Sequence, residues 1–175
     1  MSPLSKKGMT WSVRTWPSFA NNWVGLMGCG GVCDPYNGDT YCSESLPILC
    51  INYYKDMARP AYDYNAGGIV SDKGYYNGWG GGVFTVTTPV QGSSISSQAY
   101  GTQKCQQQFG PDSVMAEHHM GRYMNDMDGP PQKAWTLWNW SQTSTGGWGI
   151  WGYFGHSETG KVWTWINNQP NGNCN

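Results

Sequence analysis

The densest cluster of titratable side chains in this chain is Glu117-His118-His119. Neighbouring carboxylate and imidazole groups can act as general acid and general base in hydrolysis. If the segment is extended, Glu117 and His119 lie on one face and His118 on the other, so at most two of the three act together. One functional hypothesis is therefore a hydrolase that uses Glu117. A glycosidase would need a second carboxylate, for which Asp126 or Asp128 is the candidate.

Other catalytic signatures are missing from the sequence. It contains no His-Glu-x-x-His pattern of a zinc protease and no Gly-x-Ser-x-Gly turn of a serine hydrolase. Histidines that support the fold or orient a ligand are the simpler interpretation of the cluster. We therefore expect no catalytic residues and a protein that is not an enzyme.

Two segments carry oxygen donors beside a glycine, as in part of a calcium-binding loop. They are Asn125-Asp126-Met127-Asp128-Gly129 and Asp34-Pro35-Tyr36-Asn37-Gly38-Asp39. The same residue types stabilise tight turns, because their side-chain oxygens accept hydrogen bonds from nearby backbone amides. We expect turns and no resident cofactor, and we keep Asp126 and Asp128 as the candidate calcium ligands.

The chain has an even number of cysteines: Cys29, Cys33, Cys42, Cys50, Cys105 and Cys174. Three disulfides are the simplest interpretation, and the sequence leaves their pairing open. The alternative is a four-thiolate zinc site from the first four cysteines, whose spacing lacks the close pairs of zinc modules. Disulfides predict an extracellular location or the surface of a secreted particle.

Residues 1–24 contain no apolar run long enough for a membrane span and no signal peptide. A leader would then have been removed already, or export would use another route, such as delivery with a phage or injection particle. We expect no membrane-spanning segment.

Tryptophan is concentrated near the carboxy terminus, where seven of the eleven tryptophans lie between Trp135 and Trp165. A core of this size has limited room for so many rings, so we expect some of them at the surface. Flat rings among Asn, Gln, Ser and Thr suit sugars, and they also suit a protein interface. The predicted ligand-binding residues are Trp138, Trp140, Trp148, Trp151, Tyr153, His156, Asn167 and Gln169. The alternative is that every ring belongs to the core.

Composition narrows the class of protein further. Charged residues make up 12 % of the chain and the formal net charge is -1, so no basic patch indicates nucleic-acid binding. With 25 glycines, 10 prolines and 15 % aromatic residues, the chain is typical of a loop-rich fold held by aromatic packing. The length of 175 residues fits a single domain, in which a cysteine-rich part at 1–60 packs on a part at 83–175.

The residue pattern predicts an α+β fold of mostly antiparallel β-structure with one short helix, at about 96–109. Branched apolar residues predict strands at 46–51 and 82–88. Serines before Ala99 can cap the helix, and Gly110-Pro111 ends it. Further strands are predicted at 113–119, 135–140, 149–154 and 161–166.

The order of a strand at 83–87, a serine-rich turn, a helix with Cys105, tryptophan-rich strands and a terminal Cys174 resembles the C-type lectin-like fold and its endostatin-like relatives. The resemblance covers about 83–175. It implies a disulfide between Cys105 and Cys174. In C-type lectins a Glu-Pro-Asn or Gln-Pro-Asp triplet holds the calcium that binds sugar. The nearest match is Gln169-Pro170-Asn171, whose neutral amides are weak calcium ligands, so a polar turn is expected there.

Three functional classes follow from these patterns. The first, which we favour, is an extracellular recognition module that binds a glycan or a protein surface through the aromatic carboxy-terminal face. The second is a structural subunit of an extracellular filament, phage tail or other surface assembly, in which exposed rings pack against the next copy. The third is the hydrolase that uses Glu117.

Overall fold

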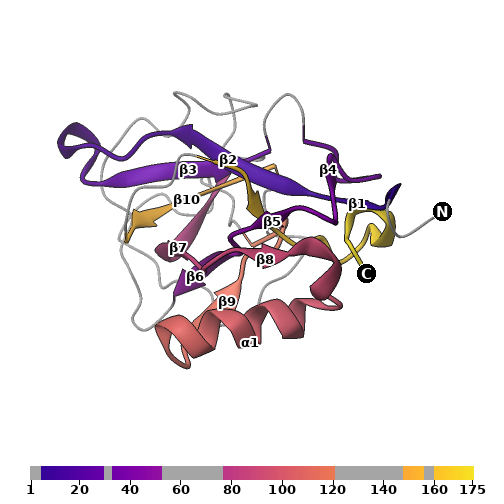
Figure 1. Ribbon diagram of the computed structural model, residues 1–175. Helices are drawn as coiled ribbons and strands as arrows, with labels where there is room; N and C mark the ends of the chain where they lie inside the picture. The colour runs from indigo at the N-terminus through magenta and orange to yellow at the C-terminus, as the bar shows by residue number, and fades with distance from the viewer. Residues whose placement is uncertain (1–4, 30–32, 53–76, 121–147, 156–159) are drawn as a thin grey trace.

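A seven-stranded mixed sheet forms the centre of the computed structural model, which describes residues 5–29, 33–52, 77–120, 148–155 and 160–175. In sheet order its strands are β11 (Val162–Trp163), β2 (Thr10–Thr15), β3 (Val24–Gly28), β10 (Gly149–Phe154), β7 (Asn77–Val86), β6 (Leu49–Asn52) and β9 (Ser113–Met115). Neighbouring strands are antiparallel, except that β10 and β7 run parallel. With one α-helix in the described ranges, the predicted α+β class with mostly antiparallel strands is confirmed (Figure 1).

This sheet combines strands from both ends of the chain. β10 lies between β3 and β7, and β11 pairs with β2 at one edge. The cysteine-rich amino-terminal part thus contributes strands to the same sheet as the later part. From the sequence we expected the first part to pack on the second. Two short ribbons lie outside the sheet: β1 (Lys7–Gly8) with β4 (Thr40–Tyr41), and β5 (Ser45–Leu46) with β8 (Val90–Gln91).

Five of the predicted strands occur, with ends that differ by a few residues. The predictions at 46–51, 82–88, 113–119, 149–154 and 161–166 correspond to β6, β7, β9, β10 and β11. The prediction at 135–140 lies outside the described residues.

The predicted helix is α1 (Gln98–Phe109), which lies along the β9 side of the sheet (Figure 1). The Ser97 hydroxyl accepts a hydrogen bond from the Tyr100 amide at 3.0 Å and so caps the first turn. Gly110 follows the last turn with a φ of 98°, a conformation that glycine adopts without a Cβ clash. Single turns of 3-10 helix are η2 (Phe19–Asn21), η3 (Gly92–Ser94) and η5 (Pro170–Gly172).

All six cysteines form disulfides, as predicted, and the alternative zinc site is wrong. The pairs are Cys29–Cys33, Cys42–Cys174 and Cys50–Cys105. The pairing of Cys105 with Cys174 that the resemblance implied is also wrong. The helix packs beside β6, which brings Cys105 to Cys50 with 5.9 Å between their Cα atoms. Cys174 follows η5 and meets Cys42 after β4.

Apolar side chains cover both faces of the central strands. Trp151 of β10 is paired with Leu26 of β3 on one side and with Trp79 of β7 on the other, and all three are fully buried on one face. Ile150, one position earlier, belongs to the cluster on the opposite face, because side chains alternate along a strand. This two-sided core is the rigid frame that carries the exposed turns.

Candidate functional site

Three of the five large hydrophobic side chains that are exposed among the described residues lie in the turn that joins β2 to β3. Phe19 is 86 % exposed, Trp23 57 % and Trp16 51 %. We call residues 16–23 the aromatic tip. The hairpin that carries it reaches out at the upper left of Figure 1, at the opposite end of the molecule from both termini. Several large apolar rings on one protruding turn indicate a contact surface.

Hydrogen bonds within the aromatic tip fix its backbone. The buried Asn21 side chain accepts from the Ser18 amide at 2.6 Å and donates to the Trp16 carbonyl at 3.0 Å. The Trp23 amide donates to the Ser18 carbonyl at 2.8 Å. These polar groups of the turn bond to one another, and the rings lie at its outer surface together with the exposed Ser18 and Asn22.

The tip also contains backbone strain. Asn22 and Trp23 are consecutive non-glycine residues with φ values of 59° and 64°, in the left-handed region. Such a conformation costs on the order of 1 kcal/mol per residue and persists where the surrounding structure holds it in place. Strained non-glycine residues are concentrated at functional sites, which is consistent with a role for this turn.

The base of the hairpin is anchored in the sheet. Val24 and Leu26 are fully buried. The Phe154 amide of β10 donates to the Trp23 carbonyl at 3.3 Å, next to the tip itself. Gly25 lies directly against the Phe154 ring, where a Cβ atom would clash. The aromatic tip is thus mounted on a rigid support.

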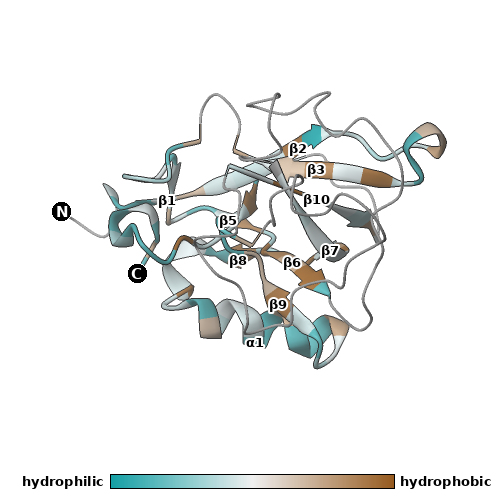
Figure 2. Ribbon diagram, turned by 180° about the vertical axis from the view of Figure 1, so that it is seen from behind, coloured by the Kyte–Doolittle hydropathy of each residue, from teal (hydrophilic) through white to brown (hydrophobic). Residues whose placement is uncertain are grey.

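The aromatic tip lies in an uncharged stretch of sequence. No Asp, Glu, Lys, Arg or His occurs between Arg14 and Asp34. Figure 2, drawn from behind, shows the same hairpin at the upper right with hydrophobic colour in its turn. Contact through this surface would therefore depend on apolar burial and very little on ionic attraction.

Sequence reasoning missed this site, although a signal for it exists. Trp16-Pro17-Ser18-Phe19-Ala20-Asn21-Asn22-Trp23 places turn-forming Pro, Ser and Asn among three large rings. A turn lies at the surface because its backbone needs hydrogen-bond partners, so aromatic residues within it are exposed.

The carboxy-terminal rings predicted to bind a ligand lie deeper than expected. Trp151 is fully buried, so its prediction as a surface ring is wrong, because β10 is an inner strand of the sheet with both faces covered. Trp148 is half-buried with a φ of 70°. Tyr153 is half-buried, its ring lies 5.8 Å from that of Trp79, and burial raises the pKa of its hydroxyl.

The remaining predicted residues are divided between the surface and the part of the chain that is not described. Asn167 is exposed and Gln169 is partly exposed. Outside the described residues lie the candidate binding residues Trp138, Trp140 and His156 and the candidate calcium ligands Asp126 and Asp128.

Glu117 is fully buried and has three polar contacts. Its Oε1 accepts from the His119 amide at 2.7 Å, and its Oε2 accepts from the Asn167 amide at 2.9 Å. His119 Nδ1 lies 2.8 Å from Oε2. The carboxylate joins the segment after β9 to the segment after β11, where Glu117 and Trp165 also form a parallel bridge. This geometry suits a group that positions its neighbours.

His118 is enclosed by aromatic rings. Its ring lies 5.3 Å from Trp148, 5.9 Å from Trp11 and 4.9 Å from His119. The side chain is 5 % exposed, and within the described structure neither ring nitrogen has a hydrogen-bond partner. Burial, and secondarily the neighbouring His119, lowers the pKa of His118 to about 3. The imidazole is therefore neutral at physiological pH.

The segment at 34–39 forms the turn that we expected. Asp34 Oδ1 accepts from the amides of Tyr36 and Asn37, at 2.9 and 3.0 Å. Asp39 Oδ1 accepts from the Thr10 amide at 3.0 Å. These carboxylates stabilise the backbone of the turn. In the part of the chain that the structure describes, no group of three or more His, Cys, Asp or Glu side chains is placed to hold a metal ion.

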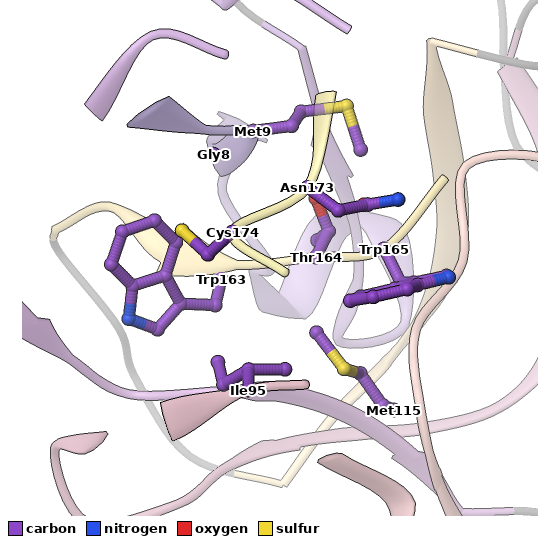
Figure 3. Close-up of a pocket in the computed structure, with 9 residues that line it drawn as sticks. All are labelled: Gly8, Met9, Ile95, Met115, Trp163, Thr164, Trp165, Asn173 and Cys174. Atoms are coloured by element: carbon purple, nitrogen blue, oxygen red, sulfur yellow. The ribbon is translucent and has the colours of Figure 1, made fainter. Parts of the chain in front are cut away.

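Cavities offer weaker candidates than the aromatic tip. The cavity of Figure 3, lined by residues such as Trp163, Trp165 and Asn173, has about 10 Å³ of room, which fits at most one water. An open hollow of about 490 Å³ beside β1 and β4 includes Lys7, whose Nζ lies 4.8 Å from the centre of the Tyr41 ring. Its lining mixes polar and apolar surface, and Asp34 in its wall already accepts hydrogen bonds from backbone amides.

Within the described ranges, no helix combines the length and the apolar character that crossing a membrane requires. Comparisons of the chain with protein-family models, with curated proteins and with solved structures found no match. The geometry of the aromatic tip is therefore the basis for the functional conclusion.

Proposed function

We propose that this protein is an extracellular recognition module that binds a partner surface through its aromatic tip. The observation that carries this proposal is the exposure of Trp16, Phe19 and Trp23 on one preordered turn. Each of these rings would remove a large apolar area from water on contact, and full burial of such a side chain is worth roughly 1.5–3 kcal/mol. Trp16 and Trp23 are already partly covered, so the three rings together would supply a substantial part, and not all, of the free energy of binding.

Rigidity of the tip supports the same proposal. Binding costs free energy when side chains and loops lose freedom, and a turn that is already ordered loses less. The Asn21 side chain and the Trp23 amide hold this turn in the unbound protein.

The disulfides between Cys42 and Cys174 and between Cys50 and Cys105 support the extracellular location, because such bonds persist outside the reducing cytosol.

This proposal changes the location of the binding face, which the sequence had placed near the carboxy terminus. Trp151 takes no part in it because it is buried. Trp148 and Tyr153 are half-buried and offer less surface than the tip.

The direct test is a triple variant, Trp16→Ser, Phe19→Ser and Trp23→Ser. The protein, labelled at a terminus away from the tip, is applied to a glycan array and to a panel of intact bacterial and eukaryotic cells. We expect the wild type to bind at least one of these surfaces and the triple variant to bind it at least about tenfold more weakly, because it loses the apolar contact area.

The matched control is Tyr41→Ser, which removes an exposed aromatic ring from β4, outside the tip. The control should bind like the wild type. Because all three substituted rings are exposed, the triple variant should keep the melting temperature of the wild type. Equal binding by the wild type and a folded triple variant would contradict the proposal.

A further inference from the structure

We propose that the partner surface of the aromatic tip is the interface of a lipid bilayer, into which Trp16, Phe19 and Trp23 insert. This inference rests on the proposed function, since it specifies what the tip binds. It is argued from the shape of the tip, from the internal pairing of its polar groups and from its lack of charge.

The first argument is the shape of the hairpin. The β2–β3 turn protrudes from the body of the molecule (Figures 1 and 2). Phe19, in the middle of the turn, is the most exposed of its three rings, with Trp16 and Trp23 on either side in the chain. A bilayer accepts a projecting apolar group without needing a complementary cavity, whereas sugar and small-molecule sites are usually concave.

The second argument is the state of the polar groups. A backbone that enters the apolar part of a membrane must satisfy its own hydrogen bonds, because no water is present there. In the tip, Ser18, Asn21 and Trp23 make several such bonds to one another and to Trp16. The same pairing engages both polar atoms of the Asn21 side chain, so this amide is not free to bind a sugar hydroxyl.

The third argument is the chemistry of the rings. Tryptophan is enriched at the boundary between headgroups and acyl chains, where its amphipathic ring is stable. Phenylalanine partitions more deeply because it has no polar atom. The stretch between Arg14 and Asp34 contains no charge that would have to leave water. Because the tip itself is uncharged, its binding should depend little on salt or on anionic lipid.

The test uses phosphatidylcholine vesicles, with and without phosphatidylserine, and the complete protein. We expect the wild type to sediment with neutral vesicles, with an affinity that changes less than about twofold between low and moderate salt. The triple Ser variant should bind about tenfold or more weakly, and Phe19→Ser alone should show a smaller loss. Tyr41→Ser should bind like the wild type.

Insertion depth provides an independent measurement. Vesicles with brominated acyl chains should quench the emission of the wild type, because Trp16 and Trp23 lie within the membrane. A Trp16→Phe, Trp23→Phe double variant keeps apolar rings at both positions, so it should still bind but lose most of the quenching.

The outcomes separate this inference from the proposed function. If the wild type binds cells or glycans through the tip but does not bind neutral vesicles, the lipid inference is overturned and the proposed function stands. Loss of tip-dependent cell binding after protease treatment would then identify a protein partner. Binding only to anionic vesicles, equally by the wild type and the triple variant, would also overturn the inference. If a folded triple variant binds every tested surface like the wild type, both proposals fail.

Discussion

Among the described groups whose pKa shift is resolved, His118 has the largest shift. It is buried among the rings of Trp11, Trp148 and His119, and its pKa is lowered to about 3, first by burial and then by the charge of His119. Glu117 is the nearby carboxylate, and it contacts His119. The site tolerates a neutral imidazole and disfavours a charged one, so protons should destabilise the fold.

We predict that lowering the pH reduces the stability of the fold, because protonation of His118 favours the unfolded state. Above pH 6.5 the imidazole is neutral in both states and contributes no pH dependence. Below pH 6.5 the unfolded chain binds a proton that the folded protein excludes until about pH 3, so the free energy of unfolding falls with pH, by about 2 kcal/mol at pH 5. Urea unfolding at pH 7 and pH 5 measures this loss.

His118→Phe is the matched variant, because it keeps a ring between Trp11 and Trp148 but cannot be protonated. Glu117 and His119 are present in both proteins, so the difference between the two pH profiles isolates His118. The variant should lose markedly less stability between pH 7 and pH 5. Parallel profiles would show that His118 does not carry the acid sensitivity.

At the scale of elements, regular patterns were predictable and long-range pairing was not. The helix at 98–109 has a serine before it and glycine after it, and β10 is a run of apolar and aromatic residues, so both were found from the sequence. The pairing of Cys50 with Cys105 depends on how α1 packs beside β6, which local spacing does not determine.

The residues of the candidate site could also be predicted only in part, because their exposure depends on long-range pairing. Trp151 was expected at the surface because a core of this size has limited room for so many tryptophans, yet β10 has neighbours on both sides and its two faces are covered. Whether a strand is an inner or an edge strand depends on pairing with segments far away in the sequence. Trp16 and Trp23 flank a turn that local residue types do indicate, and there the exposed rings could have been recognised.

The hairpin is the element whose order matters most for the proposed function. We predict that Asn21→Ala weakens binding although it removes no aromatic ring. The variant loses two hydrogen bonds that hold the turn, with a cost of about 1–2 kcal/mol. Binding should weaken severalfold, and a protease should cleave the turn faster than in the wild type. Unchanged binding and unchanged cleavage would show that the turn is held by other contacts.

At the scale of the whole molecule, the disulfide between Cys42 and Cys174 joins residues 132 positions apart. It ties the segment after η5 to the segment after β4. A cross-link of this span removes a large amount of chain entropy from the unfolded state.

We predict that Cys42→Ser with Cys174→Ser lowers the free energy of unfolding by about 3–5 kcal/mol, measured by thermal or urea unfolding. Cys29→Ser with Cys33→Ser, which opens a loop between residues 4 positions apart, should cost less. If the variant without the Cys29–Cys33 disulfide were less stable than the variant without the Cys42–Cys174 disulfide, the predicted link between loop length and stabilisation would be wrong. Reductant should lower the melting temperature of the wild type below that of either variant.

The central claim, that the molecule makes contact through its aromatic tip, is tested most directly by hydroxyl-radical footprinting of the free and the bound protein. Trp16, Phe19 and Trp23 should be oxidised severalfold more slowly when the protein is bound to its best cell surface or vesicle. The exposed rings of Tyr36 and Tyr41 should be oxidised at the same rate in both states. Protection of the two tyrosines, with unchanged oxidation of the three tip residues, would place the contact elsewhere and contradict the account.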